Sequence, residues 1–368
     1  MTIDDLALQL TPRLGTKGVT HLLEVYGDAR RIFAASRQEL IEEAELAPAV
    51  ADEVVRRSGF SAAERELHYC QKHGITPLAS TDEEYPTRLR EIPDYPHVIF
   101  LQGNPAALTG RTLAVVGTRK STPYGEEQCA RLVRELAERI PHLKIISGLA
   151  FGIDAAAHRA ALNEGLKTVA VLANSLPEIS PAHHRRLAEK ILEEGGALLS
   201  ELPSQTPMRS FHFLARNRLI AGLSSGTLLI ESPASGGSLN TAAHADSYNR
   251  TVMALPGRST DRESAGTNHL IRTHKAQLVC TASDIIEELQ WDLGEDPTLF
   301  REKPPTEQLT KDEAGLLACF RSTDPLSIEE LVELTGLDAG TLTALLVGLE
   351  LAGRIRLVPG NRYMKPCD

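Results

Sequence analysis

The sequence predicts an α/β fold, in which a doubly wound parallel sheet is preceded by a helical domain and followed by a winged helix. The main observation concerns residues 111–280, where short apolar runs rich in Val, Ile and Leu alternate with helical stretches. A second observation is that the segments on either side lack this alternation. The length of 368 residues also exceeds what one hydrophobic core usually organises, so several domains are expected.

The N-terminal segment, residues 1–75, is expected to form a small helical domain because it lacks the alternation of strands. Residues 10–27 resemble two helices joined by a Gly-containing hairpin at residues 14–18, as in SAM-like and helix-hairpin-helix modules. Such turns can offer backbone N–H groups to phosphate, but the segment is net acidic, which favours a packing role. Residues 76–110 follow as an extended lead-in, since their five prolines disfavour an interior helix or a central strand.

The central domain, residues 111–290, contains the predicted sheet. Its expected strands are residues 112–117, 143–148, 167–173, 197–201, 227–232, 251–257 and 276–280. Helices are expected at residues 125–140 and 153–165, near residues 183–195 and 241–249, and before the strand at 227. Strands and helices that alternate in this way pack as a parallel sheet with helices on both faces.

The C-terminal segment has a different character. Residues 291–310 are rich in proline and acidic residues and are expected to be a linker. Residues 311–368 then show three helical stretches and a two-stranded ribbon turning at residues 359–361, and Ser327 with Glu330 fits a capping box for the second helix. This winged-helix pattern holds 6 Lys/Arg against 9 Asp/Glu, so a protein contact or a packing role is at least as well supported as reading a DNA groove.

Charge is distributed unevenly along the chain. The net charge is −10, yet residues 111–280 hold 20 Lys/Arg against 15 Asp/Glu, so a polyanion is expected to meet the central domain. The five cysteines do not occur in metal-ligand spacing, which predicts no metal site. No apolar window is long enough for a membrane span and the start lacks a signal-peptide pattern, so we expect a cytoplasmic protein without a membrane partner.

The loops that follow the predicted strands are nearly all rich in Gly, Ser and Thr. Backbone N–H groups and hydroxyls of such loops suit phosphate oxygens, and ligands gather at this edge of an open parallel sheet. The sharpest loop is Gly117-Thr118-Arg119, where a flexible turn is followed by a guanidinium group. The motifs GxGxxG, Walker A and HExxH are absent from the sequence, which excludes the usual NAD and ATP sites and one familiar catalytic set.

The segment 211–223 combines aromatic and cationic side chains. Its notable residues are Phe211, Phe213, Arg216, Asn217 and Arg218. Aromatic rings beside guanidinium groups suit single-stranded nucleic acid, because bases stack and phosphates pair with cations. The alternative is structural, with one arginine paired with Glu201 or Glu231 and Asn217 bound to backbone. Structural roles are also the favoured interpretation for Asp154 as a helix cap and His158 as a packed histidine, with His183-His184 at an exposed helix start.

Six motifs occur in an order that resembles the DNA processing protein A (DprA, also called Smf) family of bacteria. They are VGTRKSTPYG, SGLAFGIDAAAH, FxxRNRLIAGLS, SGGSLNTA, LPG and GTNHLI, within roughly residues 80–280. The resemblance implies an extended Rossmann-like domain that binds single-stranded DNA, uses no cofactor, performs no catalysis and forms a homodimer. It further implies protection of incoming single strands in natural transformation and help in loading RecA onto them.

The single-stranded DNA site expected from these motifs and from the charges beside them has thirteen members. They are Gly117, Thr118, Arg119, Lys120, Ser121, Arg209, Phe213, Arg216, Asn217, Arg218, Ser238, Asn240 and Thr241. The chain departs from the family pattern at Leu214, where a proline is usual, and at Ser210, where a basic residue is usual. It also departs at residues 173–181, which lack the family's glycines and tyrosine, and by one extra residue in GTNHLIRTHKA.

Two other functions compete with this interpretation. The stretch SPASGGSLNTAAHAD superficially resembles the PGGxGTxxE loop of lysine-decarboxylase-like (LOG) nucleotide or nucleoside hydrolases. In that loop a glutamate serves the chemistry, whereas here the acid is displaced and shortened to Asp246. A winged helix could alternatively make the protein a regulator that binds duplex DNA, although the acidic balance of that domain argues against it.

Overall fold

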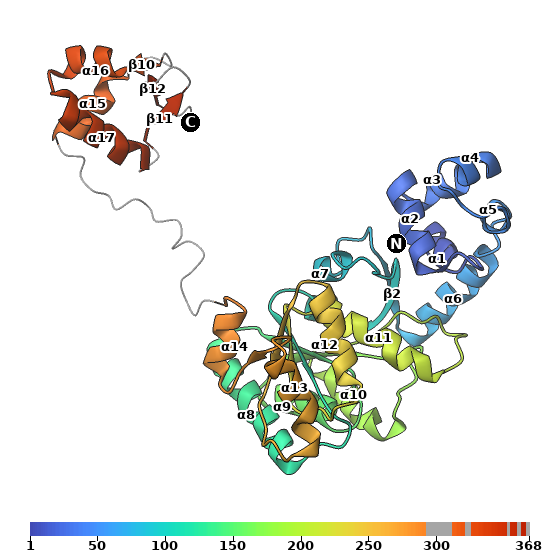
Figure 1. Cartoon of the computed structure of the whole chain (residues 1–368). Coiled ribbons are helices and arrows are strands. Elements are labelled where there is room, and N and C mark those ends of the chain that lie inside the picture. The colour runs from blue at the N-terminus through green and yellow to red at the C-terminus, as the bar shows by residue number, and fades with distance from the viewer. Residues whose placement is uncertain (292–310, 321–324, 352–353, 359–361, 366–368) are drawn as a thin grey trace. The chain divides into compact units, whose positions relative to one another are not determined.

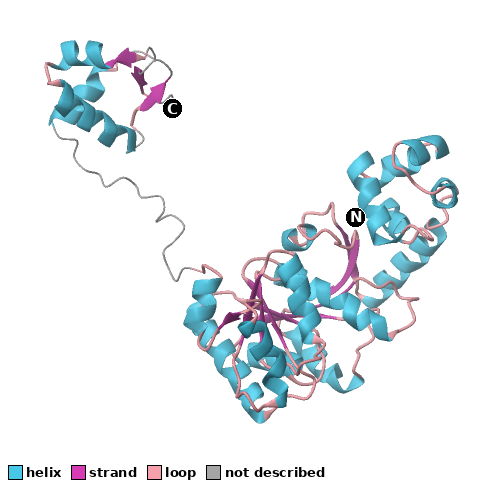
Figure 2. Cartoon of the chain, viewed as in Figure 1, coloured by secondary structure: helices cyan, strands magenta, loops and turns pink. Residues whose placement is uncertain are grey.

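The predicted sheet is present, with helices around it (Figures 1 and 2). It has nine strands in the order β1-β2-β6-β5-β4-β3-β7-β8-β9. The computed structural model describes residues 1–291, 311–320, 325–351, 354–358 and 362–365, which are divided between two units, Met1–Leu293 and Gly294–Asp368. The sheet belongs to the first unit. Its strands are β1 Thr76–Ala79, β2 Val98–Gly103, β3 Thr112–Val116, β4 Lys144–Ser147, β5 Lys167–Val171, β6 Ala197–Ser200, β7 Gly226–Leu229, β8 Thr251–Ala254 and β9 Gln277–Leu278.

Strands β3 to β9 are the ones that the apolar runs predict, and all neighbours among them are parallel. The lead-in was expected to be extended and to contain no central strand, and the second part of this expectation is wrong. Strand β2 lies inside the sheet, antiparallel to both β1 and β6. Pro77 falls in β1 at the edge, where a missing N–H group is tolerated, and residues 98–103 contain no proline.

Helices cover both faces of the sheet, as a doubly wound fold requires. Alternate residues of β3 point to opposite faces: Leu113 and Val115 join one core cluster, while Ala114 and Val116 join another. The first cluster includes residues of α8, α9 and α14, and the second includes residues of α7, α11, α12 and α13. These helices are α7 Thr87–Arg90, α8 Pro123–Arg139, α9 Ile153–Asn163, α11 Ser210–Leu223, α12 Ser238–Ser247, α13 Ala265–Arg272 and α14 Ala282–Glu288.

The order of the strands reverses beside β3. From β3 the chain moves outward through β4, β5 and β6, and it then returns to place β7 on the other side of β3. The loops that leave β3 and β7 therefore diverge toward opposite faces, and a crevice forms between them at the carboxyl ends of the strands. The fold thus provides a ligand site before any particular side chain is considered.

The N-terminal segment is helical, as predicted. Its helices are α1 Ile3–Gln9, α2 Gly15–Tyr26, α3 Ala29–Ala34, α4 Arg37–Glu42, α5 Pro48–Val55 and α6 Phe60–His73. The predicted hairpin at residues 14–18 is misplaced, because α2 already begins at Gly15 and the turn lies over residues 10–14. These helices share a core with α10, Arg185–Glu193, and with residues of β2, β5 and β6.

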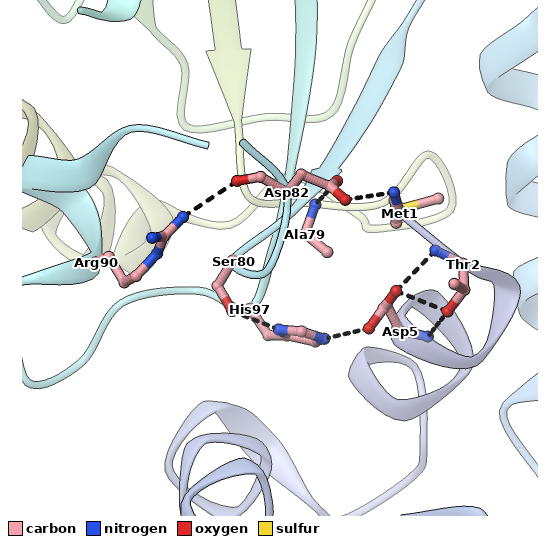
Figure 3. A network of polar contacts seen from close by, with 8 residues as sticks. All are labelled: Met1, Thr2, Asp5, Ala79, Ser80, Asp82, Arg90 and His97. Carbon is pink, nitrogen blue, oxygen red and sulfur yellow. Dashed lines mark hydrogen bonds and ion pairs between the residues drawn. The ribbon is translucent and has the colours of Figure 1, made fainter. Parts of the chain in front are cut away.

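A buried polar network joins the N-terminal helices to the sheet (Figure 3). The Asp5 carboxylate of α1 lies 3.2 Å from His97 Nε2, and His97 Nδ1 lies 2.8 Å from the Ser80 hydroxyl. Thr2 donates to Asp5 through its backbone N–H and its hydroxyl, both at 2.7 Å. Although burial alone would raise it, the hydrogen bonds from His97 and Thr2 bring the pKa of Asp5 down to about 2.

The second unit has the winged-helix elements. They are α15 Lys311–Cys319, α16 Ile328–Thr335 and α17 Ala339–Leu351, with a sheet of β10 Leu326–Ser327, β12 Arg362–Met364 and β11 Arg356–Val358 in that order. The predicted capping box of Ser327 and Glu330 is present. The predicted turn at 359–361 and residues 292–310 of the predicted linker lie outside the described residues. Trp291, assigned to the linker, is instead buried in the core of the first unit.

Within the described part of the chain, no single helix is both long and apolar enough to cross a membrane. Helices α16 and α17 meet that criterion only as a pair, and they are bent by 108° at their junction.

Replacing Asp5 tests the polar network. We expect Asp5→Asn to lower the free energy of unfolding at neutral pH by about 1–3 kcal/mol, because His97 and Thr2 lose a charged acceptor. Since the pKa of Asp5 is lowered, its stabilisation is complete above the ordinary value of 3.8 and is lost as the pH falls toward 2. Thermal unfolding followed by circular dichroism should therefore show a gap between the two proteins that narrows below pH 4. Asp4→Asn, in the same helical turn, is the matched control, and a gap independent of pH would contradict the assignment.

Candidate functional site

A cavity of about 530 Å³ opens at the carboxyl ends of β3 and β7, where the strand order reverses. Its walls come from the loop after β3, the start of α9, one face of α11, the loop after β7 with the start of α12, and the loop after β8. The predicted site residues that line it are Gly117, Thr118, Arg119, Lys120, Phe213, Arg216, Asn217, Ser238 and Thr241. The structure thus brings together side chains that are up to 124 residues apart in the sequence.

The loop after β3 presents cations at the mouth of this cavity. Thr118 anchors the loop, because its backbone N–H donates to the Glu231 carbonyl at 2.7 Å. Arg119 and Lys120 are exposed, and within the described residues neither forms an ion pair. The guanidinium carbon of Arg119 lies 5.2 Å from the centre of the half-buried Phe213 ring, a cation–π contact. Positive charge and an aromatic face are therefore adjacent and open to a ligand.

Arg216 forms the floor of the cavity and is almost fully buried. Its Nη1 donates to the carbonyl of Gly148 at 2.8 Å and to the carbonyl of Val171, so it joins the loop after β4 to the last residue of β5. Burial lowers the pKa of Arg216 to about 10, which still leaves it charged at neutral pH. A Cβ at Gly148 would lie 2.5 Å from the guanidinium, so only glycine leaves room for Arg216.

Asp154 is the buried counter-charge in this region. Burial raises the pKa of its carboxyl group, and the positive charge of Arg216 opposes that rise. The expectation that Asp154 caps α9 is wrong, since its carboxylate accepts from the Gly148 N–H at 3.2 Å, in the preceding loop. His158, one helical turn later, is a packed histidine as expected: it is fully buried, and burial lowers its pKa to about 3.

Polar contacts fix α11 against α12. Asn217 Nδ2 donates to the Gly237 carbonyl at 3.2 Å and lies 3.5 Å from Asn240 Oδ1. Asn240 therefore contacts a residue of the cavity wall without lining the cavity itself. The Ser238 hydroxyl donates to Ser232 Oγ at 2.9 Å. The hydrogen bond from Asn217 to a backbone carbonyl is the structural alternative expected from the sequence. The same side chain also lines the cavity.

Three predicted site residues lie elsewhere. Arg218 points away from the cavity and pairs with Glu201, while its Nη1 donates to the Asp94 carbonyl at 2.6 Å. This ion pair is the structural alternative that the sequence left open. Ser121 donates to Glu126 at 2.6 Å, and exposed Arg209 is the N-cap residue before α11; neither lines the cavity.

The loop that leads into α11 is held by the N-terminal helices. Glu66 of α6 is buried, and its carboxylate accepts from the backbone N–H of Ser204 at 2.9 Å and from the Ser204 hydroxyl at 2.6 Å. The helical segment therefore contributes to the position of one wall of the site.

The sequence analysis missed several residues of the site. Glu263 lines the cavity and accepts from the Thr118 hydroxyl at 2.8 Å, with Arg262 beside it. Their loop was noted only for its small residues. Phe151 follows Ala150 of the cavity wall but does not itself line the cavity; it is 46% exposed, and its ring centre lies 4.9 Å from that of His184. His184 itself was expected to be exposed, yet it is buried, with Nδ1 2.8 Å from the carbonyl of Leu149.

Two further observations bear on chemistry. Asp246, the acid weighed for catalysis, is exposed in the last turn of α12 and does not line the cavity. No group of three or more His, Cys, Asp or Glu side chains is placed to hold a metal ion in the described part of the chain.

Comparison with known proteins finds clear similarity over most of the chain. The family model for DNA recombination-mediator protein A matches residues 76–290, and that for the DprA winged helix domain matches residues 300–361. Protein Smf of Escherichia coli (strain K12) is 38% identical over 300 residues, which is 80% of this chain and 79% of the relative.

Two solved structures are also similar. DNA processing protein A from Streptococcus pneumoniae superposes with a TM-score of 0.68 at 31% identity, over 78% of this chain and 98% of that one. DNA processing protein A from Helicobacter pylori, a structure that concerns its single-stranded DNA binding mode, has a TM-score of 0.54 at 30% identity, over 60% of this chain and 98% of that one.

The two arginines of the cavity should differ in their effect on stability. We expect Arg216→Ala to lower the free energy of unfolding by about 3–5 kcal/mol, because buried Asp154 loses its positive neighbour and two carbonyls lose their donor. Exposed Arg119→Ala should change it by less than about 0.5 kcal/mol. Urea unfolding followed by fluorescence of Trp291, the single and buried tryptophan, measures both. Equal losses in the two variants would show that Arg216 is not a structural element of the floor.

Proposed function

The chain belongs to the DNA recombination-mediator protein A family, and we propose that it binds single-stranded DNA in the cavity at the ends of β3 and β7. The observation that carries the proposal is the pair of exposed cations, Arg119 and Lys120, with Phe213 beneath the guanidinium of Arg119. Cations without ion-pair partners suit phosphates, and an accessible ring suits a base. The related protein from Helicobacter pylori, described for its single-stranded DNA binding, supports the same ligand.

The mode of binding follows from which groups are free. Arg119 and Lys120 neutralise phosphates, Phe213 offers a stacking surface, and the loop after β7 adds small residues through which a strand can approach the backbone. Arg216 contributes its positive charge from below, since its hydrogen bonds are already directed to the Gly148 and Val171 carbonyls. Stacking and phosphate contacts tolerate any base, so the preference for particular sequences is weak.

We further propose the wider role that the resemblance to the DprA family implies. The protein protects single strands that enter the cell in natural transformation, helps to load RecA onto them, and acts as a homodimer through the unit that contains the sheet. Binding, and not catalysis, is its contribution. The position of Asp246 outside the cavity supports this view against the hydrolase alternative, and incubation with nucleoside monophosphates should release no free base.

Loss of Arg119 tests the proposed interface. We expect Arg119→Ala to weaken binding of a labelled oligo(dT) by about tenfold or more and to reduce the log–log salt slope by about 0.7, the value for one phosphate contact on a single strand. Fluorescence anisotropy at several salt concentrations, with a matched duplex, measures both quantities. Arg134→Ala, which removes an exposed arginine of α8 outside the cavity, is the control. Equal affinity for single strand and duplex, or an unchanged Arg119→Ala variant, would refute the interface.

Deletion of residues 300–368 tests the duplex-binding alternative. Since the cavity is formed wholly by residues of the first unit, the truncated protein should keep its affinity for oligo(dT) largely unchanged. The same anisotropy titration measures the outcome. A large loss of affinity on truncation would instead assign DNA binding to the winged helix.

A further inference from the structure

A second cavity, of about 330 Å³, lies at the opposite edge of the sheet, where β4 and β5 begin. Lys144 is the first residue of β4 and Lys167 is the first residue of β5, and the two are paired across these parallel strands. Neighbouring residues in such a pair direct their side chains to the same face. Both lysines line the cavity, together with His142 at its rim.

The two ammonium groups lack a counter-charge in the part of the chain that the structure describes. Neither Lys144 nor Lys167 forms an ion pair or a side-chain hydrogen bond among the described residues, and no carboxylate lines the cavity. Both side chains are partly buried. Burial and the charge of Lys167 lower the pKa of Lys144, so the protein tolerates a repulsion that an anion would relieve.

The local backbone keeps the ammonium group of Lys144 free of obstruction. Gly110 has a φ of +84°, and a Cβ at this position would lie 3.0 Å from Lys144 Nζ. The buried side chains of Leu143 and Leu166 also line the cavity and exclude water from one side. The volume is at the lower end of the range of about 300–1,000 Å³ that small-molecule sites occupy.

We propose that this second cavity binds a phosphate group, carried either by a small phosphorylated molecule of about mononucleotide size or by a DNA strand. Two partly buried ammonium groups that line one cavity suit a phosphate dianion, which can accept hydrogen bonds from both. The remainder of the ligand can pack against the apolar wall formed by Leu143 and Leu166. This site shares no residue with the cavity proposed for single-stranded DNA, so it does not depend on that proposal.

The test uses the full chain and compares inorganic phosphate, thymidine monophosphate and thymidine at constant ionic strength. Thermal unfolding should shift upward with the two phosphates and not with thymidine, because a ligand that binds only the folded state stabilises it. Lys144→Glu places a carboxylate beside Lys167, so this variant should be at least as stable without ligand and should lose the shift. Lys167→Gln should weaken phosphate binding by about tenfold or more. Lys190→Gln, an exposed lysine of α10, is the matched control and should respond like the wild type.

Arg119→Ala separates the two cavities, since it should leave the phosphate shift intact. Binding of oligo(dT) identifies the source of the phosphate. If Lys144→Glu weakens the binding of oligo(dT), the second cavity binds DNA. If the affinity of this variant for oligo(dT) is unchanged, the second cavity binds a small phosphorylated molecule. The proposal is overturned if the wild type shows no response to either phosphate, or if Lys144→Glu and Lys167→Gln respond as the wild type does.

Discussion

The buried guanidinium of Arg216 is the interaction on which the rest of the candidate site depends. It comes from α11, binds the carbonyl of Gly148 after β4 and that of Val171 at the end of β5, and its charge opposes the rise that burial causes in the pKa of Asp154 at the start of α9. Three separate segments are thereby held around one cation. Because removing this cation would leave two buried carbonyls without their donor and Asp154 without its positive neighbour, the floor of the cavity depends on it.

The topology of the sheet explains why the charged loops meet at all. Reversal of the strand order beside β3 opens a crevice there, and the nearly uniform use of small residues after the strands keeps this crevice open to a ligand. In the proposed interface, affinity can then be adjusted through Arg119 and Lys120, which are exposed and, within the described residues, form no ion pair. The N-terminal helices add support from outside, through Glu66 and the loop that it holds.

Much of the fold could be predicted from the sequence, because buried parallel strands are short apolar runs that end in glycine or polar residues. Strand β2 was missed because the prolines around it were counted for the whole lead-in, although residues 98–103 contain none. The roles of Arg216 and Arg218 could not be separated by residue type. Their positions could have done so: Phe213, Arg216, Asn217 and Ile220 follow the spacing of one helical face, and all four line the cavity, whereas Arg218 lies on another face. The partner of Thr118 was beyond prediction, since Glu263 is 145 residues away.

Because Arg216 has a structural role, its presence in a related sequence is not by itself evidence of DNA binding. A descendant that had abandoned DNA would still need the arginine, the asparagine beside it and Gly148 to keep its fold, so these parts of the motif would persist after the function had gone. Arg119 and Lys120 are exposed and are not needed for the fold, so substitutions would accumulate first at these two positions. If Arg119 and Lys120 bind DNA as proposed, this exposed pair, and not buried Arg216, Asn217 and Gly148, is the place in a related sequence where loss of DNA binding would first become visible.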